Sequence, residues 1–357
     1  MIPTSVKCKR KLEPDGSYDK HKTRTAARGD LLVRKLIRLG MDLPDTYSPT
    51  IRTLTFLLVM QIAIAKGLKC ATQDIKYAYL NADIPESDVP IITKLHPLVA
   101  KMCGLDPNQL YQIMKCLYGL PKSGKLWYEH YTRNLIREGY TQSSYDPCLF
   151  YRINEHEVTF ICLFVDDTFV FSISEENLNL FLQTMQKHFQ VSLDTTAESF
   201  LGIHFEHLPD GSVLMSQPKL LMKVLKEYPK LNGYRSKKHP YGPQPSAGHE
   251  DQYAKAPPIE QGKYLRLLGI LLYLTKSRPD IMTAVSFGAT KSHAPNAIDY
   301  RKLLYIVEYL RITPTKGHRI YSNKDQPVQL HCTVDASYLL HPDSKGHTGY
   351  TIGFYNE

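Results

Sequence analysis

The order of polar and apolar positions predicts that strands and helices alternate along the first half of the chain. Residues 1–47 are polar and rich in turn formers, and Pro14-Asp15-Gly16 predicts a hairpin turn between two short basic segments. Ser48-Pro49 predicts the start of a helix, because serine caps helix N-termini and proline suits the first turn, and Gly67 predicts its end. Further periodic segments predict two strands and a helix, over residues 70–75, 110–114 and 125–137.

A nearly continuous apolar run from Val158 to Val165 predicts a strand that is buried on both faces. Asp166 and Asp167 interrupt this run, and the apolar character resumes from Thr168 to Phe171. The two acids are therefore expected in a tight turn between paired strands. A helix and another strand are predicted to follow, over residues 175–189 and 200–206.

The second half of the chain predicts a linker, a group of helices and a final pair of strands. A short helix is predicted over 219–227, and residues 233–260 are rich in proline, glycine, serine and lysine, which is typical of a linker. The helical patterns beyond it cover residues 261–276, 280–291 and 298–311, and the strand patterns cover 328–334 and 348–355.

The composition excludes several classes of protein. With 43% hydrophobic and 22% charged residues, the 357-residue chain is of ordinary globular type and has room for two or three domains. Its longest apolar run, Phe56 to Ala65, is too short to span a bilayer, and no secretory signal begins the chain. Seven scattered cysteines without a Cys-x-x-Cys pair argue against disulfides and zinc. We therefore expect an intracellular protein without a membrane partner.

The net charge of +9 favours a polyanionic partner. Basic residues cluster at 7–11, 20–28 and 235–238. Charge runs are as often simply solvated faces, so the charge supports a nucleic-acid partner only if independent chemistry points the same way.

Such chemistry is indicated by three aspartates. Asp166 and Asp167, adjacent in a poorly hydrated turn, repel each other, and a divalent cation stabilises such a pair. Ligand sets made of oxygen alone favour Mg²⁺ or Mn²⁺ over zinc. Asp74, at the end of a separate predicted strand, would close the site, as two-metal nucleotidyl transfer requires. An ordinary polar turn is the alternative that the residues alone leave open.

Six segments, in order, resemble the reverse transcriptases of Ty/copia-type retrotransposons. Phe164-Val165-Asp166-Asp167 is similar to the catalytic aspartate hairpin of this family, and residues 73–81 (QDIKYAYLN) are similar to its first acidic segment. Residues 117–128 (LYGLPKSGKLWY) resemble the segment between these two. The remaining similarities cover residues 22–29, 200–203 and 272–281, and the resemblance runs from about residue 5 to the end of the chain.

The resemblance assigns roles to the acids. It implies that Asp74 and Asp166 are direct ligands of two Mg²⁺ ions, with Mn²⁺ as an alternative. Asp167 would be the third catalytic acid and less directly engaged, because adjacent strand residues point to opposite faces.

The resemblance also implies a nucleotide site. Tyr79 would pack on the sugar and reject a 2′-hydroxyl, with an ordinary core or surface tyrosine as the alternative. Lys22 and Arg24 would contact the incoming triphosphate, unless they are simply solvated. Gly119 and Lys122, from the segment between the acidic motifs, complete the predicted nucleotide-binding residues.

The implied fold is α+β, a right-hand polymerase. Fingers, a ferredoxin-like palm with an antiparallel sheet and a small thumb are expected over residues 1–232. The linker at 233–260 precedes a helical connection at 261–315 and a partial ribonuclease H-like sheet at 316–357. Only Asp343 and Glu357 follow Asp335 as acids, so no ribonuclease H activity and an exposed strand edge are expected.

These features predict an RNA-directed DNA polymerase. Its partners would be an RNA or DNA template with primer, deoxynucleoside triphosphates and other segments of a retrotransposon polyprotein, in a cytoplasmic particle or in the nucleus. Two departures leave open a decayed copy that only binds nucleic acid: Pro121-Lys122 replaces the usual Lys-Gln, and a tryptophan-containing segment before the basic motif is absent. A P-loop NTPase is a third alternative, because Gly119 to Lys125 fits G-x-x-x-x-G-K, although Leu126 replaces the metal-binding Ser or Thr.

Overall fold

The computed structural model describes most of the chain, namely residues 1–12, 18–86, 88–228, 230–231, 239–241, 255–321, 329–338 and 346–355. The predicted Pro14-Asp15-Gly16 turn and most of the predicted linker lie outside these residues. The chain divides into two compact units: unit 1 contains Met1–Phe56 and Lys69–Thr196, and unit 2 contains Leu57–Leu68 and Ala197–Glu357. None of the helices in the described residues is long and apolar enough to cross a membrane.

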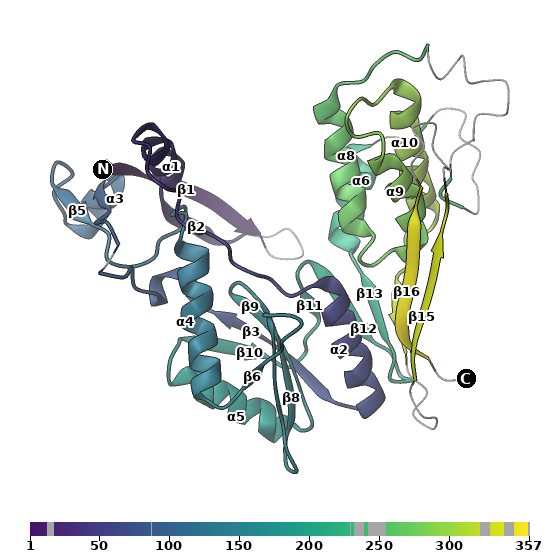
Figure 1. Ribbon diagram of the computed structural model, residues 1–357, viewed down its shortest axis with the longest axis horizontal. Coiled ribbons are helices and arrows are strands. Elements are labelled where there is room, and N and C mark those ends of the chain that lie inside the picture. Colours follow the sequence, from purple (N-terminus) through teal and green to yellow (C-terminus); the bar gives the residue numbers. More distant parts are fainter. Residues whose placement is uncertain are drawn as a thin grey trace. The chain divides into compact units, whose positions relative to one another are not determined.

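Unit 1 is built on a six-stranded sheet in which every neighbouring pair is antiparallel. The strand order is β10-β3-β9-β8-β7-β6 (Figure 1). The strands are β3 (Lys69–Ile75), β6 (Thr141–Gln142), β7 (Leu149–Ile153), β8 (Val158–Phe164), β9 (Asp167–Ser172) and β10 (Val191–Asp194). The predicted strands at 70–75 and 158–165 are confirmed, and the apolar run is indeed paired with the segment that follows the two acids.

Two helices, α4 (Ser123–Arg137) and α5 (Glu175–Gln186), pack against strands of this sheet. Tyr131 of α4 is fully buried, and its hydroxyl donates to Gln73 Oε1 at 3.1 Å. Phe189, just after α5, lies edge-on to Trp127 of α4, with ring centres 5.4 Å apart. Ser174 caps α5, as its hydroxyl accepts from the amide of the third helical residue.

The helix predicted from Ser48 begins five residues later, as α2 (Thr53–Lys66). Other contacts hold the residues before it outside the helix: Ser48 Oγ donates to the Gly124 carbonyl at 3.1 Å, and the Ile51 amide donates to the Leu163 carbonyl at 3.1 Å. Phe56, in the first turn of α2, packs against Phe169 and Phe171 of β9, with ring centres 5.4 Å and 6.3 Å apart.

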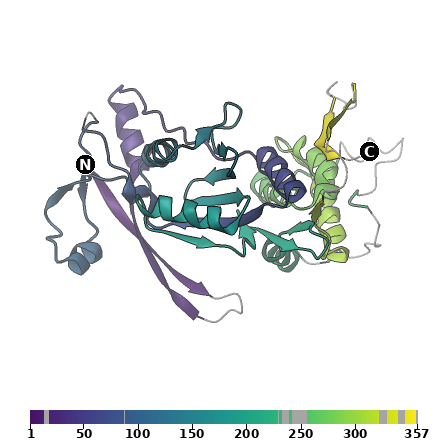
Figure 2. The same ribbon diagram turned by 90° about the horizontal axis from the view of Figure 1, so that it is seen from below.

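Unit 1 also contains a smaller sheet whose main feature is a long hairpin. Strands β1 (Ile2–Leu12) and β2 (Tyr18–Ala27) pair antiparallel from Thr4↔Ala27 to Leu12↔Tyr18 and project from the rest of the unit (Figure 2). They are longer than the two short segments expected from the sequence. Sequence patterns did not predict α1 (Gly29–Arg38), η1 (Ala78–Asn81), β4 (Ile92–Lys94) or α3 (Pro97–Cys103), nor the strands β6, β7 and β10 of the larger sheet. β5 (Leu110–Gln112) matches the predicted strand at 110–114.

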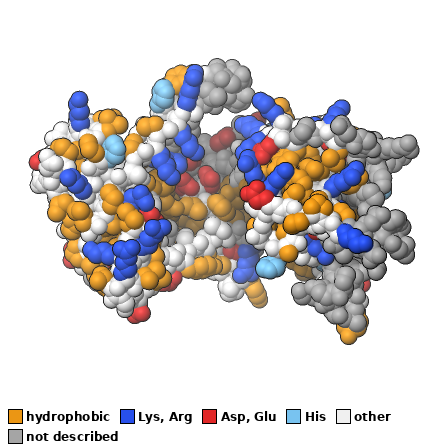
Figure 3. Space-filling view, turned by 90° about the horizontal axis from the view of Figure 1, so that it is seen from above, with side chains coloured by type: hydrophobic (Ala, Val, Ile, Leu, Met, Phe, Trp, Pro, Cys, Tyr) orange, Lys and Arg blue, Asp and Glu red, His pale blue; other side chains and the backbone are white. Residues whose placement is uncertain are grey.

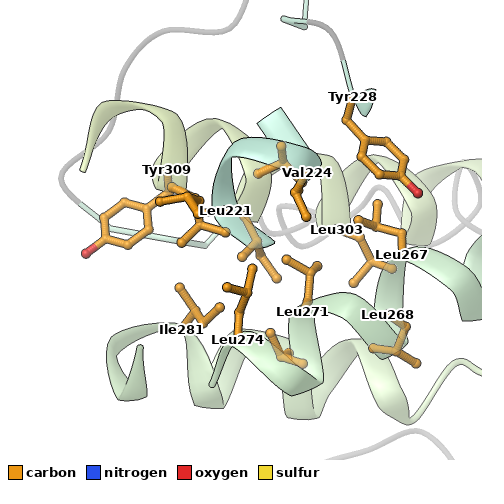
Figure 4. Packing of buried hydrophobic residues seen from close by; sticks show 14 of the residues in the cluster. Leu221, Val224, Tyr228, Leu267, Leu268, Leu271, Leu274, Ile281, Leu303 and Tyr309 are labelled. Carbon is orange, nitrogen blue, oxygen red and sulfur yellow. The ribbon is translucent and has the colours of Figure 1, made fainter. Parts of the chain in front are cut away.

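In the described part of unit 2, helices α6, α8, α9 and α10 form a common hydrophobic core. The helices are α6 (Pro218–Glu227), α8 (Gln261–Leu274), η2 (Pro279–Ile281), α9 (Met282–Ala289) and α10 (Ala297–Ile312). Leu221 and Val224 of α6 pack against Leu271 and Leu274 of α8 and Leu303 of α10 (Figure 4). The helix before the predicted linker and the helices after it therefore share one core. The division between 1–232 and 261–315 stays a prediction.

The predicted strand over 200–206 is broken into two, β11 (Ser199–Phe200) and β12 (Ile203–His207), which pair antiparallel. The break is a turn in which Leu201 has φ 53° and Gly202 has φ 69°, a conformation that glycine adopts readily. Tyr273 donates its hydroxyl to the Leu201 carbonyl at 2.5 Å. Two of the segments that carry the family resemblance therefore contact each other.

The remaining strands of unit 2 complete two sheets. β13 (Val213–Ser216) and β14 (His318–Ile320) extend the first sheet in the order β11-β12-β13-β14. β15 (Gln329–Ala336) and β16 (Thr348–Tyr355) form a separate antiparallel pair, and every residue of β15 is exposed. The final two predicted strands are thus confirmed, whereas their ribonuclease H-like character stays a prediction.

Candidate active site

The two adjacent acids lie at the tip of the β8–β9 hairpin. Val165 and Asp166 form the turn, and Asp167 is the first residue of β9. Val165 has φ 58°, a left-handed conformation that is costly for a β-branched residue and so needs support from its surroundings. Trp127 gives this support, because its buried indole Nε1 donates to the Val165 carbonyl at 2.7 Å.

The third acid lies directly beside this tip. In the β3–β9 register Asp74 is opposite Asp167, and Gln73 is opposite Thr168. Gln73 and Thr168 both contact the Tyr131 hydroxyl of α4, and neighbouring strand residues point to opposite faces. Asp74 and Asp167 therefore share the sheet face that points away from α4.

Asp166 is joined to the same strand through its backbone. The Ile75 amide donates to the Asp166 carbonyl at 3.3 Å, so the turn is tied to the residue that follows Asp74. The structure thus brings Asp74, Asp166 and Asp167 together at one end of the sheet. It places Asp167, which was expected to be the least engaged acid, opposite Asp74.

The charges of the three acids interact. The pKa of Asp167 is raised to about 6, first because its carboxyl is desolvated and then because Asp166 and Asp74 lie near it. A carboxylate cluster that raises a member's pKa in this way gains stability from a nearby cation.

Two tyrosines and an arginine flank the acids. The rings of Tyr79 and Tyr118 meet edge to face with centres 4.8 Å apart, and the Arg24 guanidinium lies 5.0 Å from the centre of the Tyr118 ring. Burial raises the pKa of both tyrosines, and Asp166 raises each further. Tyr79 and Arg24, which were predicted from separate motifs, are therefore linked through Tyr118 next to Asp166.

Local backbone contacts fix the turn that carries Tyr79. Tyr77 has φ 57° and is the residue just before the short helix η1. The Asn81 side-chain amide donates to the carbonyls of Lys76 and Tyr77, both at 3.2 Å. Asn81, at the end of the first acidic segment, thus fixes the conformation of the turn that places Tyr79 after Asp74.

Gly119 allows two segments of backbone to approach each other. It has φ +90°, and a Cβ built on it would lie 2.2 Å from the Ala27 carbonyl oxygen. The Ala27 amide in turn donates to the Tyr118 carbonyl at 2.7 Å. Gly119 was predicted to bind nucleotide; in the structure its visible role is to let the end of β2 pack against the residues around Tyr118.

The two predicted lysines have different surroundings. Lys122 Nζ donates to both carboxylate oxygens of Asp88, at 2.9 Å and 2.8 Å. It also lines an apolar cavity of about 510 Å³ to which α1 contributes and which none of the three acids lines. Lys22 lies on β2 opposite Lys9, and its side chain is outside the described residues. Nucleotide binding by either lysine stays a prediction.

Sequence reasoning missed Tyr118 and Trp127 as members of the site. Both lie in the segment 117–128 that resembles the family. Two features of the sequence could have indicated them: Tyr118 is next to Gly119, and Trp127 is the only tryptophan of the chain. On the face drawn in Figure 3, lysine and arginine side chains form several small groups.

The structure gives partial support for a metal centre. The donor set is made of carboxylate oxygens, which suits Mg²⁺ or Mn²⁺. Among the described residues, however, no three His, Cys, Asp or Glu side chains converge closely enough to hold a metal ion by themselves. All seven cysteines are present as thiols.

Comparison with known proteins identifies the family. The family described as "Reverse transcriptase (RNA-dependent DNA polymerase)" matches residues 2–241. The chain belongs to this family. It is 25% identical over 344 residues to the "Retrovirus-related Pol polyprotein from transposon RE1" of Arabidopsis thaliana, a match that covers 96% of the chain and 22% of that protein.

Other relatives of this reverse transcriptase chain are also transposon polyproteins. The "Retrovirus-related Pol polyprotein from transposon TNT 1-94" of Nicotiana tabacum is 24% identical over 365 residues, covering 98% of the chain and 26% of that protein. The "Transposon Ty1-ER2 Gag-Pol polyprotein" of Saccharomyces cerevisiae is 30% identical over 224 residues, covering 59% of the chain and 11% of that protein. The chain thus spans about a quarter or less of these relatives.

The P-loop alternative does not agree with this geometry. Lys125, which would have to reach a bound phosphate, is in the first turn of α4 and pairs with Asp45 at 2.6 Å. The apolar strand β8 continues through the acids into β9 as a hairpin, instead of ending at a nucleotide loop.

Proposed function

We propose that the chain is an RNA-directed DNA polymerase whose catalytic acids are Asp74, Asp166 and Asp167. The observation that carries this proposal is the β3–β9 register, which puts Asp74 opposite Asp167 beside the turn that holds Asp166. The six-stranded sheet of unit 1 would be the palm, and the β1–β2 hairpin would belong to the fingers.

The acids would hold divalent cations together with the substrates. Mg²⁺ in nucleotide-handling sites is bound by one or two carboxylates, with the remaining ligands supplied by substrate phosphates and water. Within the part of the chain that the structure describes, the three acids do not form a closed ligand set, which fits a site that is completed by the incoming nucleotide. When bound, two such ions would activate the primer 3′-hydroxyl and stabilise the leaving oxygen.

The chain's own residues would bind and select the nucleotide. The Arg24 guanidinium, held beside the acids, would offset charge on the triphosphate, where fixed positive charge is most effective. Tyr79, held by the Asn81 contacts, would lie against the sugar and exclude a 2′-hydroxyl. The substrates would be a primed RNA or DNA template and deoxynucleoside triphosphates, and the other segments of a polyprotein would be partners.

Primer extension on poly(rA)/oligo(dT), with Mg²⁺ and separately with Mn²⁺, tests the proposal. We expect extension by the wild type, and a loss in kcat of at least about 10³-fold, or ~4 kcal/mol, in Asp166→Asn. Glu155→Gln, which removes one charge from an exposed hairpin loop, is the matched control and should keep full activity. A less than tenfold loss in Asp166→Asn would remove this acid from the catalytic centre.

A second pair of measurements separates polymerisation from binding alone. Template-primer affinity should fall steeply with salt, since phosphate contacts dominate such binding. If the wild type binds template-primer in this way but extends it with neither metal, the chain is a decayed copy that only binds nucleic acid.

Tyr79→Val should admit ribonucleotides while it leaves deoxynucleotide incorporation largely intact.

A further inference from the structure

Tyr118 contacts two side chains that would bind different parts of a nucleotide. Its ring centre lies 5.0 Å from the Arg24 guanidinium carbon, within the range of a cation–π interaction. The same ring meets Tyr79 at a centre-to-centre distance of 4.8 Å and an angle of 62°, a favourable edge-to-face geometry. Both contacts are made by the ring of Tyr118.

The backbone on either side holds this ring in place. The Tyr118 carbonyl accepts from the Ala27 amide, and Gly119 lets the two chain segments approach so closely. Ser123 closes the loop, since its hydroxyl accepts from the Leu117 amide at 3.1 Å and donates to the Leu117 carbonyl at 2.8 Å. The loop that carries Tyr118 is therefore anchored both to β2, the strand of Arg24, and to the start of α4.

Tyr118 also lies close to the acids. Burial raises its pKa most, Asp166 and Asp74 raise it further, and Arg24 lowers it. Its ring is thus placed among the carboxylates, the arginine and the second tyrosine. A flexible arginine on the exposed part of a hairpin would otherwise lose much rotamer freedom on binding a phosphate, and a ring that holds it in advance lowers this entropic cost.

We propose that Tyr118 is a positioning residue that holds Arg24 for the triphosphate and Tyr79 for the sugar, and thereby couples nucleotide affinity to rejection of ribonucleotides. This inference rests on the proposed polymerase function. It assigns a role to a residue whose neighbours in the motif, Gly119 and Lys122, have structural contacts instead.

The two ring contacts give distinct expectations for two substitutions. Tyr118→Phe keeps both contacts and should keep the KM for dTTP and the preference for dTTP over UTP within about twofold. Tyr118→Ala loses both contacts, and we expect the KM for dTTP to rise about tenfold, equivalent to ~1.4 kcal/mol of nucleotide binding. The preference for dTTP over UTP should fall by a similar factor, with kcat changed much less than KM.

The test is steady-state primer extension on poly(rA)/oligo(dT) with dTTP or UTP as the nucleotide. The variants are Tyr118→Phe, Tyr118→Ala, Arg24→Ala and the double variant of Tyr118→Ala with Arg24→Ala. Tyr145→Ala serves as the matched control, because Tyr145 is also a tyrosine of unit 1 but is 87% exposed. Thermal unfolding of each variant shows whether it remains folded at the assay temperature.

The double variant identifies coupling. If Tyr118 acts through Arg24, its removal should add little, less than about threefold, to the KM of Arg24→Ala, because interacting residues are not additive. Additive effects, or equal loss in Tyr118→Phe and Tyr118→Ala, would overturn the inference, as would a fall in kcat alone at unchanged KM and unchanged sugar preference. If the wild type extends no primer, the proposed function fails together with the inference; if the wild type extends primers normally, only the inference is at stake.

Discussion

Replacing Asp167 with asparagine is expected to make the metal-free protein more stable while it abolishes polymerisation. The pKa of Asp167 is raised to about 6 by desolvation and by the nearby Asp166 and Asp74. At pH values between 3.8, the ordinary pKa of an aspartate, and about 6, the Asp167 carboxyl binds more protons in the folded protein than in the unfolded chain. Stability therefore falls as the pH rises through this interval, and above pH ~6 the loss is complete. Asparagine has the same shape without the charge, so the variant lacks this loss.

The size of the effect follows from the same pKa. The interval from 3.8 to about 6 corresponds to ~3 kcal/mol, at about 1.36 kcal/mol per pH unit. The Asp167 carboxyl is only partly desolvated, because the residue is exposed at the surface, so solvent screening reduces this figure and we expect ~1 kcal/mol in the free energy of unfolding. For a chain of 357 residues, whose unfolding entropy grows with its length, that is a rise in Tm of roughly 1–2 °C.

Thermal unfolding followed by circular dichroism, in the presence of a chelator and over a series of pH values, measures this effect. The Tm of Asp167→Asn should exceed that of the wild type above pH ~6 and match it below pH ~4, while Glu155→Gln controls for the change in net charge. Added Mg²⁺ should reduce the difference, because it binds the folded wild type more tightly. If the Tm of Asp167→Asn at neutral pH with chelator is equal to or lower than that of the wild type, the three carboxylates do not destabilise one another.

Three further substitutions test the supports of the site and of unit 2. Trp127→Phe leaves the turn carbonyl at the hairpin tip without its donor, so we expect a loss of ~1–3 kcal/mol in unfolding free energy by urea titration and a lower kcat. Gly119→Ala places a Cβ against a backbone carbonyl and should destabilise by more than ~2 kcal/mol, whereas Gly40→Ala, with a similar positive φ and open space, should cost only about 1 kcal/mol. Arg278→Ala removes a guanidinium that is 3% exposed and pairs with Asp280, so we expect the unfolding free energy measured by urea titration to fall by about 3–5 kcal/mol. A fall of less than ~1 kcal/mol would mean that the pair contributes little to stability.

The central part of the fold could be predicted because its signals are local. The apolar run around Asp166 and Asp167 has the length and residue types of a buried strand, and the resumption of apolar residues after the acids fits only a hairpin. The strand that carries Asp74 was found in the same way. The family resemblance implied only that the acids of these two strands share a metal site, and the pairing of the strands and its register are seen in the structure.

Elements determined by distant contacts could not be predicted. The start of α2 is displaced because Ser48 bonds to Gly124 and Ile51 bonds to Leu163, which lie far away in the sequence. The turn at Leu201 requires a positive φ at a leucine, which no local propensity favours. The shared core of α6 with α8 and α10 crosses the predicted linker, and composition alone separated these helices.

The candidate site shows the same division. Residue types pointed to the acids, because charge is a property of single side chains, whereas the roles of Tyr79 and Arg24 were implied by the family resemblance. The role of Tyr118 depends on what its ring touches, and Lys122 pairs with Asp88, a partner that the sequence does not reveal. Side-chain partners across the fold, rather than motif membership, decide which residues of the segment 117–128 face the acids.

Counting bound Mn²⁺ by electron paramagnetic resonance tests the shared cation site most directly. The sample would contain the protein with a dideoxy-terminated primer on its template and dTTP, corrected for Mn²⁺ bound by nucleic acid and nucleotide alone. We expect about two ions for each wild-type protein and for Glu155→Gln. Asp74→Asn and Asp166→Asn should each lose at least one of these ions, although the two residues are far apart in the sequence. Unchanged Mn²⁺ binding in both variants would contradict the account.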